Sequence, residues 1–98
     1  MASLTGRHHV LLYDYVPDIL ERRPAHRDAH LGYIGAWTAD GRVLMGGAVG
    51  DPPHGAVIVF TCPREEVEAF AAADPYVTAG LVTSWRVEPW NVVVGASV

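Results

Sequence analysis

The sequence predicts an α+β fold of the ferredoxin-like type, with the element order βαββαβ, a four-stranded antiparallel sheet and two helices on one face of that sheet. Three observations support this prediction. Four segments are rich in residues that favour strands, two segments have the apolar spacing of helices, and turn residues separate these segments. With 98 residues, the chain is expected to form a single domain over residues 1–98.

The first half of the chain begins with a strand and continues with a helix. The segment HVLLYDY, residues 9–15, is rich in strand-favouring residues, and the turn residues at 16–18 end it. The segment PAHRDAHLGYIGAWTA, residues 24–39, is expected to be a helix. Pro24 is acceptable in its first turn, and Asp40-Gly41 supplies the stop signal.

The second half supplies a hairpin, a second helix and a last strand. Residues 42–49 and 56–61 are expected to be strands, and GDPPHG at 50–55 is the turn between them, because prolines are poor partners in a sheet. Residues 63–73 form a helix that Pro63 opens and that carries two glutamates in its first turn, where negative charge is favourable. Residues 81–90 form the fourth strand.

Both faces of the predicted sheet are apolar. In the stretches 10–13, 43–45 and 57–60, apolar residues occupy both parities, whereas a strand with one wet face would alternate. Two helices of the predicted length cover only one face. We therefore expect the other face to meet a second subunit in a homodimer.

Composition and charge exclude several classes of partner. The net charge is −4 and the seven arginines are scattered along the chain, which argues against nucleic acid. No apolar run approaches the roughly 18 residues of a membrane span, and the start MASLTGRHH lacks the features of a signal peptide. Cys62 is the only cysteine and fits a reducing compartment, so the protein is expected to be cytoplasmic.

His30 is the first candidate for chemistry. At 100° per residue it shares one face of the first helix with apolar and aromatic residues and with one further histidine: His26, Tyr33, Ile34 and Trp37. A polar ring on this face is either a core histidine bonded to a carbonyl or, where a cleft reaches it, a general acid or base.

Asp74 is the second candidate, because it follows an alanine-rich helical run whose carbonyl end disfavours negative charge. One reading makes it the N-cap of a further helix, with Pro75 at the first position. The other gives this carboxylate a part in a reaction, and the two are compatible. A carboxylate that accepts from one imidazole nitrogen would fix the tautomer and stabilise the imidazolium, although sequence spacing does not establish that contact.

Further residues near these two have alternative readings. His26 and His30 have the i, i+4 spacing of a metal pair, but no third ligand is evident and no metal is expected. Arg27 either binds an anionic group of a substrate or is an exposed arginine paired with Asp28 or Glu21. A hydroxyl on Tyr76 would reach the same cleft as Asp74.

Two segments resemble the YCII-related (YciI-like) family: RDAHLGYIGAWTADGRVLMGG at 27–47 and ADPYVTAGLVTSWRVEPW at 73–90. The resemblance implies a ferredoxin-like subunit in a dimeric α+β barrel, with an active site built on a histidine and an aspartate that map to His30 and Asp74. The family members with an assigned activity look like small enzymes that need no cofactor and act on ring-derived or chlorinated aromatic metabolites. This chain departs from the pattern in a second string, RPAH at 23–26, and the distance to Gly41 favours His30 over His26.

We therefore expect a small enzyme without a cofactor, in which His30 moves a proton, Asp74 orients His30, and Arg27 and Tyr76 bind a small substrate that is carboxylate-bearing or ring-derived. The reaction would be of the lyase, isomerase or dehalogenase type, next to a carbonyl. The alternative is a non-catalytic dimeric protein that binds a small molecule or serves as an accessory module.

Overall fold

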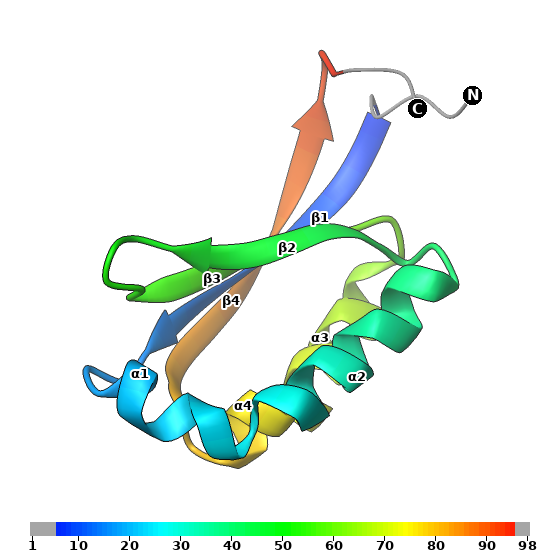
Figure 1. Cartoon of the computed structure of the whole chain (residues 1–98). Coiled ribbons are helices and arrows are strands. Elements are labelled where there is room, and N and C mark those ends of the chain that lie inside the picture. Colours follow the sequence, from blue (N-terminus) through cyan, green and yellow to red (C-terminus); the bar gives the residue numbers. More distant parts are fainter. Residues whose placement is uncertain (1–5, 96–98) are drawn as a thin grey trace.

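The fold has four antiparallel strands in the order β2-β3-β1-β4, which confirms the ferredoxin-like prediction (Figure 1). The computed structural model of the chain describes residues 6–95, so residues 1–5 and 96–98 of the expected domain lie outside the described part. The elements are β1 Gly6–Tyr15, α1 Ile19–Arg22, η1 Arg23–Ala25, α2 Arg27–Ala39, β2 Val43–Val49, β3 Gly55–Phe60, α3 Arg64–Ala73, α4 Pro75–Thr78 and β4 Val82–Val92.

The strand register directs one set of side chains toward the helices. Leu11 in the central strand β1 lies opposite Ile58 of β3 and Val87 of β4, and all three are buried. Tyr13, two residues further on, lies opposite Ala56 and points to the same face, because side chains alternate along a strand. The core therefore begins on this face of β1.

Helices α2 and α3 cover that face of the sheet (Figure 1). Val67 and Phe70 of α3 are fully buried against it. The residues of α2 that are not exposed are those that the sequence places on one stripe: His30, Tyr33, Ile34 and Trp37. The predicted helix face is thus confirmed.

The start of the first long helix differs from the prediction. A single helix from Pro24 was expected, whereas α1 and η1 come first and α2 begins at Arg27, after His26 with φ −122° and ψ −3°. Pro24 has no N–H to donate to the carbonyl of Leu20, so α1 cannot continue through it. Ile19 is buried beside Tyr76 and Leu81, which fixes this short helical segment against α4.

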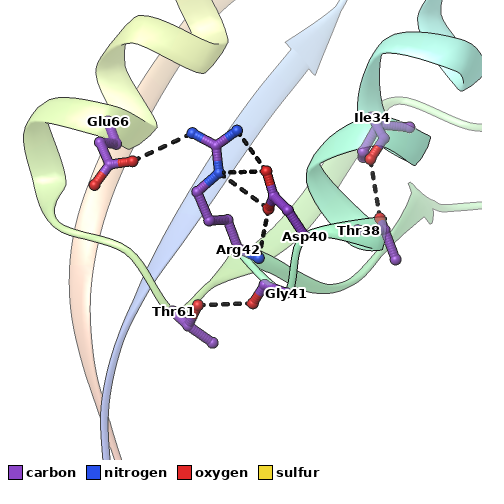
Figure 2. Close-up of polar contacts among 7 residues, drawn as sticks. All are labelled: Ile34, Thr38, Asp40, Gly41, Arg42, Thr61 and Glu66. Carbon is purple, nitrogen blue, oxygen red and sulfur yellow. Dashed lines mark hydrogen bonds and ion pairs between the residues drawn. The ribbon is translucent and has the colours of Figure 1, made fainter.

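Arg42 links the ends of α2 and α3 (Figure 2). Its guanidinium lies 3.6 Å from the centre of the Trp37 ring and forms ion pairs with Asp40 at 2.7 Å and Glu66 at 3.2 Å. Thr61 donates from its hydroxyl to the carbonyl of Gly41, at 2.8 Å. These contacts connect the C-terminus of α2, the end of β3 and the first turn of α3.

The second face of the sheet carries apolar side chains that no element within residues 6–95 covers (Figure 1). A shallow groove of about 310 Å³ lies on it, and its lining residues are Val10, Leu12, Val57, Glu88, Pro89 and Trp90. Trp90 is 47% exposed there. The apolar residues of β1 and β3 agree with the expectation for this face, whereas β4 places Glu88 opposite Val10 and Arg86 opposite Leu12. Within the same residues, none of the helices has the length and apolar character needed to span a bilayer.

Gly55 lies where β3 approaches β1 so closely that a Cβ would collide with the backbone carbonyl oxygen of Tyr13. We predict that Gly55→Ala lowers the free energy of unfolding by about 1–3 kcal/mol, because backbone atoms cannot move aside cheaply. The matched control is Gly35→Ala in α2, where a Cβ meets no heavy atom within 4 Å. That change should raise stability by up to about 1 kcal/mol. Urea unfolding of both variants measures the difference, and equal stabilities would contradict the prediction.

Candidate active site

Asp74 occupies the junction between α3 and α4 and is completely buried. Its backbone is extended, and its Oδ1 accepts a hydrogen bond from the backbone N–H of Tyr76 at 3.0 Å. Pro75 stands in the first turn of α4. The predicted N-cap is therefore present, and it fixes the carboxylate in the interior of the protein.

Two side chains from other elements complete the hydrogen bonding of this carboxylate. The hydroxyl of Tyr13, on β1, donates to Oδ2 at 2.7 Å, and Nδ1 of His30, on α2, lies 2.7 Å from Oδ1. A buried carboxylate without such partners would be strongly unfavourable. The structure thus joins His30 and Asp74 across 44 positions of the chain.

The contact with Asp74 assigns the two nitrogens of the His30 ring. A carboxylate accepts hydrogen bonds, so Nδ1 carries the hydrogen, and the neutral ring keeps a lone pair on Nε2. Within residues 6–95, no buried side-chain nitrogen or oxygen lacks a partner, and Nε2 makes no hydrogen bond there. Nε2 therefore faces accessible space, and His30 lines a pocket.

The ring of Tyr76 packs against the face of the His30 imidazole. The two rings are stacked, with centroids 3.9 Å apart and planes 9° from parallel. Tyr76 is only 3% exposed, and its edge meets the ring of Tyr15 at 6.3 Å. Its ring, rather than the hydroxyl considered from the sequence, is what the structure shows in contact with His30.

The pocket has a volume of about 230 Å³, and its lining includes residues of η1, α2 and the β2–β3 hairpin. Ile34 and Ile58 form an apolar wall, and Gly46 and Gly47 of β2 contribute backbone. A Cβ on Gly46 would lie 3.2 Å from one carbon of Ile58 and 3.4 Å from Ile34. Glycine at this position thus leaves the space between hairpin and helix open.

Two arginines, Arg23 and Arg27, also line the pocket. Burial raises the pKa of the nearby Tyr15 to about 12, with smaller contributions from Tyr76 and Asp74, and both arginines act in the opposite direction. Tyr15 lines the same pocket as both arginines. Among the described residues, Arg27 forms neither of the ion pairs that the sequence offered as alternatives.

The buried tyrosine behind the site stays protonated. Burial is the main reason that the pKa of Tyr13 rises well above its ordinary value, and the charge of Asp74 and the hydrogen bond to it act in the same direction. The Tyr13 hydroxyl therefore remains a hydrogen-bond donor to the carboxylate throughout the physiological pH range.

The structure brings together all four residues that the sequence singled out. His30, Arg27 and Tyr76 line the pocket, and Asp74 lies directly behind His30. His26, the competing histidine, ends η1 as a half-buried residue and is not part of the described pocket lining. Within residues 6–95, no group of three or more His, Cys, Asp or Glu side chains is placed to hold a metal ion.

Three residues of the site were missed from the sequence: Tyr13, Tyr15 and Arg23. A signal for Tyr13 was present, since it has the same strand parity as Leu11 and a buried tyrosine hydroxyl needs a partner. Cys62, the single cysteine, is buried, and burial raises the pKa of its thiol, which makes it less reactive.

Solved structures share this fold. A 5-chloro-2-hydroxyhydroquinone dehydrochlorinase from Burkholderia phenoliruptrix AC1100, in complex with 2,5-dihydroxybenzoquinone, is 25% identical, with a TM-score of 0.73 over 86% of this chain and 93% of that one. A candidate antibiotic biosynthesis monooxygenase from Nitrosomonas europaea is 11% identical, with a TM-score of 0.58 over 99% of this chain and 100% of that one. The second likeness shows the fold alone.

The sequence comparisons identify the family. No curated protein matches the chain. The family profile of the YCII-related domain matches residues 8–91, a range that contains both long helices, the whole pocket lining and Asp74. The chain therefore belongs to the YCII-related family.

Proposed function

We propose that this protein is a small cytoplasmic enzyme that needs no cofactor and uses His30 as a general acid-base, with Asp74 orienting it. One observation carries the proposal: a fully buried carboxylate bonds to Nδ1 of His30 at 2.7 Å, while Nε2 of the same ring faces a pocket. A bond of this kind fixes the tautomer and stabilises the ring when it takes up a proton.

The proposed reaction begins with proton removal next to a carbonyl. Nε2 of His30 takes the proton either from a carbon next to the carbonyl or, on a hydroxylated ring in its keto form, from a hydroxyl conjugated with the carbon that carries the leaving group. Asp74 stabilises the resulting imidazolium. The electron pair left on the substrate then forms a double bond, either as a leaving group such as chloride departs or as His30 returns the proton to another atom. The first route is an elimination, which releases one proton and one chloride ion, and the second is an isomerisation.

The pocket suits a small ring-derived substrate. Its volume of about 230 Å³ lies below the roughly 300–1,000 Å³ of sites for drug-sized ligands. Arg27 would pair with a carboxylate or phenolate, and the flat Tyr76 ring keeps the imidazole from rotating. The dehydrochlorinase, which is 25% identical and was solved with a dihydroxybenzoquinone, supports the elimination route.

We also propose that the protein is a homodimer that pairs the open faces of two sheets, as in a dimeric α+β barrel. The surface of the groove is almost entirely apolar, although Glu88 is among its lining residues, and Trp90 lines it while half exposed. A contiguous exposed apolar face of this kind marks an interaction surface in many proteins, and a second copy would cover it symmetrically.

We predict that His30→Asn lowers turnover of 5-chloro-2-hydroxyhydroquinone by about 10²- to 10⁴-fold, because the acid-base group is lost. Asp74→Asn should cause a smaller loss of turnover, because the imidazole that takes the proton is still present. A loss is expected because an amide neither fixes the tautomer of His30 nor stabilises the imidazolium. Chloride release measures turnover, and circular dichroism checks that each variant is folded. His26→Asn is the matched control and should retain activity, because this ring lies outside the described pocket lining.

Undiminished chloride release by folded His30→Asn protein would refute the proposed acid-base role. If wild-type protein binds 2,5-dihydroxybenzoquinone, followed by its absorbance, but turns over no chlorinated relative, the non-catalytic binding alternative gains instead.

Tyr13→Phe tests whether the hydrogen bond from the Tyr13 hydroxyl to Asp74 contributes to stability and turnover. Removing the hydroxyl leaves Oδ2 of Asp74 without its donor, so the free energy of unfolding should fall by about 1–3 kcal/mol near neutral pH. The same change should lower kcat more than it raises KM. Tyr33→Phe is the control, since that hydroxyl donates to the carbonyl of Phe70 instead. Its kcat should stay close to that of the wild type.

The same variant makes a prediction at alkaline pH. Above the ordinary tyrosine pKa of 10.0, the folded wild type keeps the Tyr13 proton that the unfolded chain loses. The free energy of unfolding should therefore fall by about 1.4 kcal/mol per pH unit for this group. Tyr13→Phe removes that contribution, so its stability should fall less steeply between about pH 10 and 11. Equal slopes in urea unfolding would show that Tyr13 titrates normally.

For the dimer, we predict that the wild type sediments at twice the 10.6 kDa mass of the chain. Leu12→Glu should give a folded monomer, because it places a charge in the centre of the apolar groove. Leu20→Glu is the matched control, since Leu20 is 47% exposed on α1, which lies on the helix side. A monomeric wild type, or a Leu12→Glu variant that still dimerises, would refute the proposed pairing.

A further inference from the structure

We propose that the pocket selects planar ring compounds that carry two negative groups, with Arg23 and Arg27 each pairing with one of them. The inference rests on the proposed function, because it names the substrate class of the same site. It adds Arg23, which belongs to the RPAH string in which this chain departs from the family pattern.

Charge is distributed very unevenly around the pocket. The chain as a whole has 11 acidic residues and a net charge of −4. The described pocket lining nevertheless includes two arginines and no aspartate or glutamate, and Asp74 lies behind His30 with its hydrogen bonds already made. A concave site lined by one sign of charge raises the local concentration of ligands of the opposite sign.

Three other arginines of the chain have protein partners, which the two pocket arginines, like Arg86, do not have within residues 6–95. Arg22 pairs with Asp18, Arg42 pairs with Asp40 and Glu66, and Arg64 donates to the carbonyl of Val87. Within residues 6–95, Arg23 and Arg27 have neither an ion pair nor a side-chain hydrogen bond to a protein group. Their guanidinium donors are therefore available to a ligand.

The backbone explains why both arginines reach one pocket. Arg23 opens η1 and Arg27 opens α2, and the non-helical His26 separates the two elements. Burial of Ile19 against Tyr76 and Leu81 holds the segment before them. The two arginines, four positions apart, therefore border the same pocket from η1 and from the first turn of α2.

Two like charges that face one cavity repel each other, and a ligand that neutralises both relieves that repulsion. Each guanidinium forms a two-pronged contact that matches the geometry of a carboxylate or of adjacent phenolate oxygens. The same pocket also has apolar lining from Ile34 and Ile58, which can hold the hydrocarbon part of a ring. A ring with two separated anionic groups satisfies both guanidiniums at once, whereas a monoanion satisfies one.

The test compares benzene-1,3-dicarboxylate with benzoate in isothermal titration calorimetry on the full chain at low salt. The wild type should bind the dicarboxylate at least about tenfold more tightly than benzoate. Arg23→Gln should abolish that preference and leave benzoate binding nearly unchanged, whereas Arg27→Gln should weaken both. Arg22→Gln is the matched control, because its partner is Asp18, and it should preserve the preference.

An equal affinity of the wild type for the two probes, absence of binding of either, or a preference that survives Arg23→Gln would each overturn the inference. The His30→Asn variant separates it from the proposed function. If this variant keeps the dicarboxylate preference while wild-type protein shows no turnover, the recognition site stands and the catalytic proposal falls. If wild-type protein turns over substrate but shows no preference for two anionic groups, the catalytic proposal stands and this inference falls.

Discussion

The structure depends on one buried carboxylate. Asp74 is inaccessible to solvent, yet its two oxygens accept from three donors on three different elements: Tyr13 of β1, His30 of α2 and the Tyr76 backbone of α4. Removing a carboxylate from water costs several kcal/mol unless such bonds replace the lost hydration. The packed state is therefore favourable only when strand, helix and cap come together at this point. The bonds that make burial tolerable are the same ones that orient His30, so fold and candidate site share one requirement.

This requirement, with two other contacts, fixes α2 along its length. His30 is tied to Asp74 near the start of the helix, and the Tyr33 hydroxyl donates to the carbonyl of Phe70 one turn later, at 3.0 Å. At the far end, Arg42 lies over Trp37. The same guanidinium pairs with Glu66 in the first turn of α3 (Figure 2). A helix held at three levels keeps a constant distance from the sheet, which gives the pocket between α2 and the hairpin a defined width.

The sequence predicted what depends on neighbours in the chain. The stripe of His30, Tyr33, Ile34 and Trp37 follows from helical spacing, and the Asp74 cap follows from the Asp-Pro pair. The sequence could not predict what depends on distant residues. Tyr13 meets Asp74 across 61 positions, and no local pattern encodes that contact. The helix start was wrong for a related reason: the break before Arg27 is supported by Ile19, whose partners in the core lie on and after α4. Local rules place Pro24 in a first turn equally well in either arrangement.

The pocket lies on the helix side of the sheet, and the open groove lies on the opposite face of the same sheet. Gly46 lies opposite Ile58 and faces α2, whereas Gly47 lies opposite Val57, whose side chain lines the open groove. Because neither glycine has a side chain, only the backbone of the edge strand β2 separates the pocket from that face here. A larger residue at Gly46 would press on Ile34 and Ile58, and so would narrow the space beside His30. Small residues in β2 therefore serve the pocket more than the sheet, since glycine is otherwise unfavourable inside a strand.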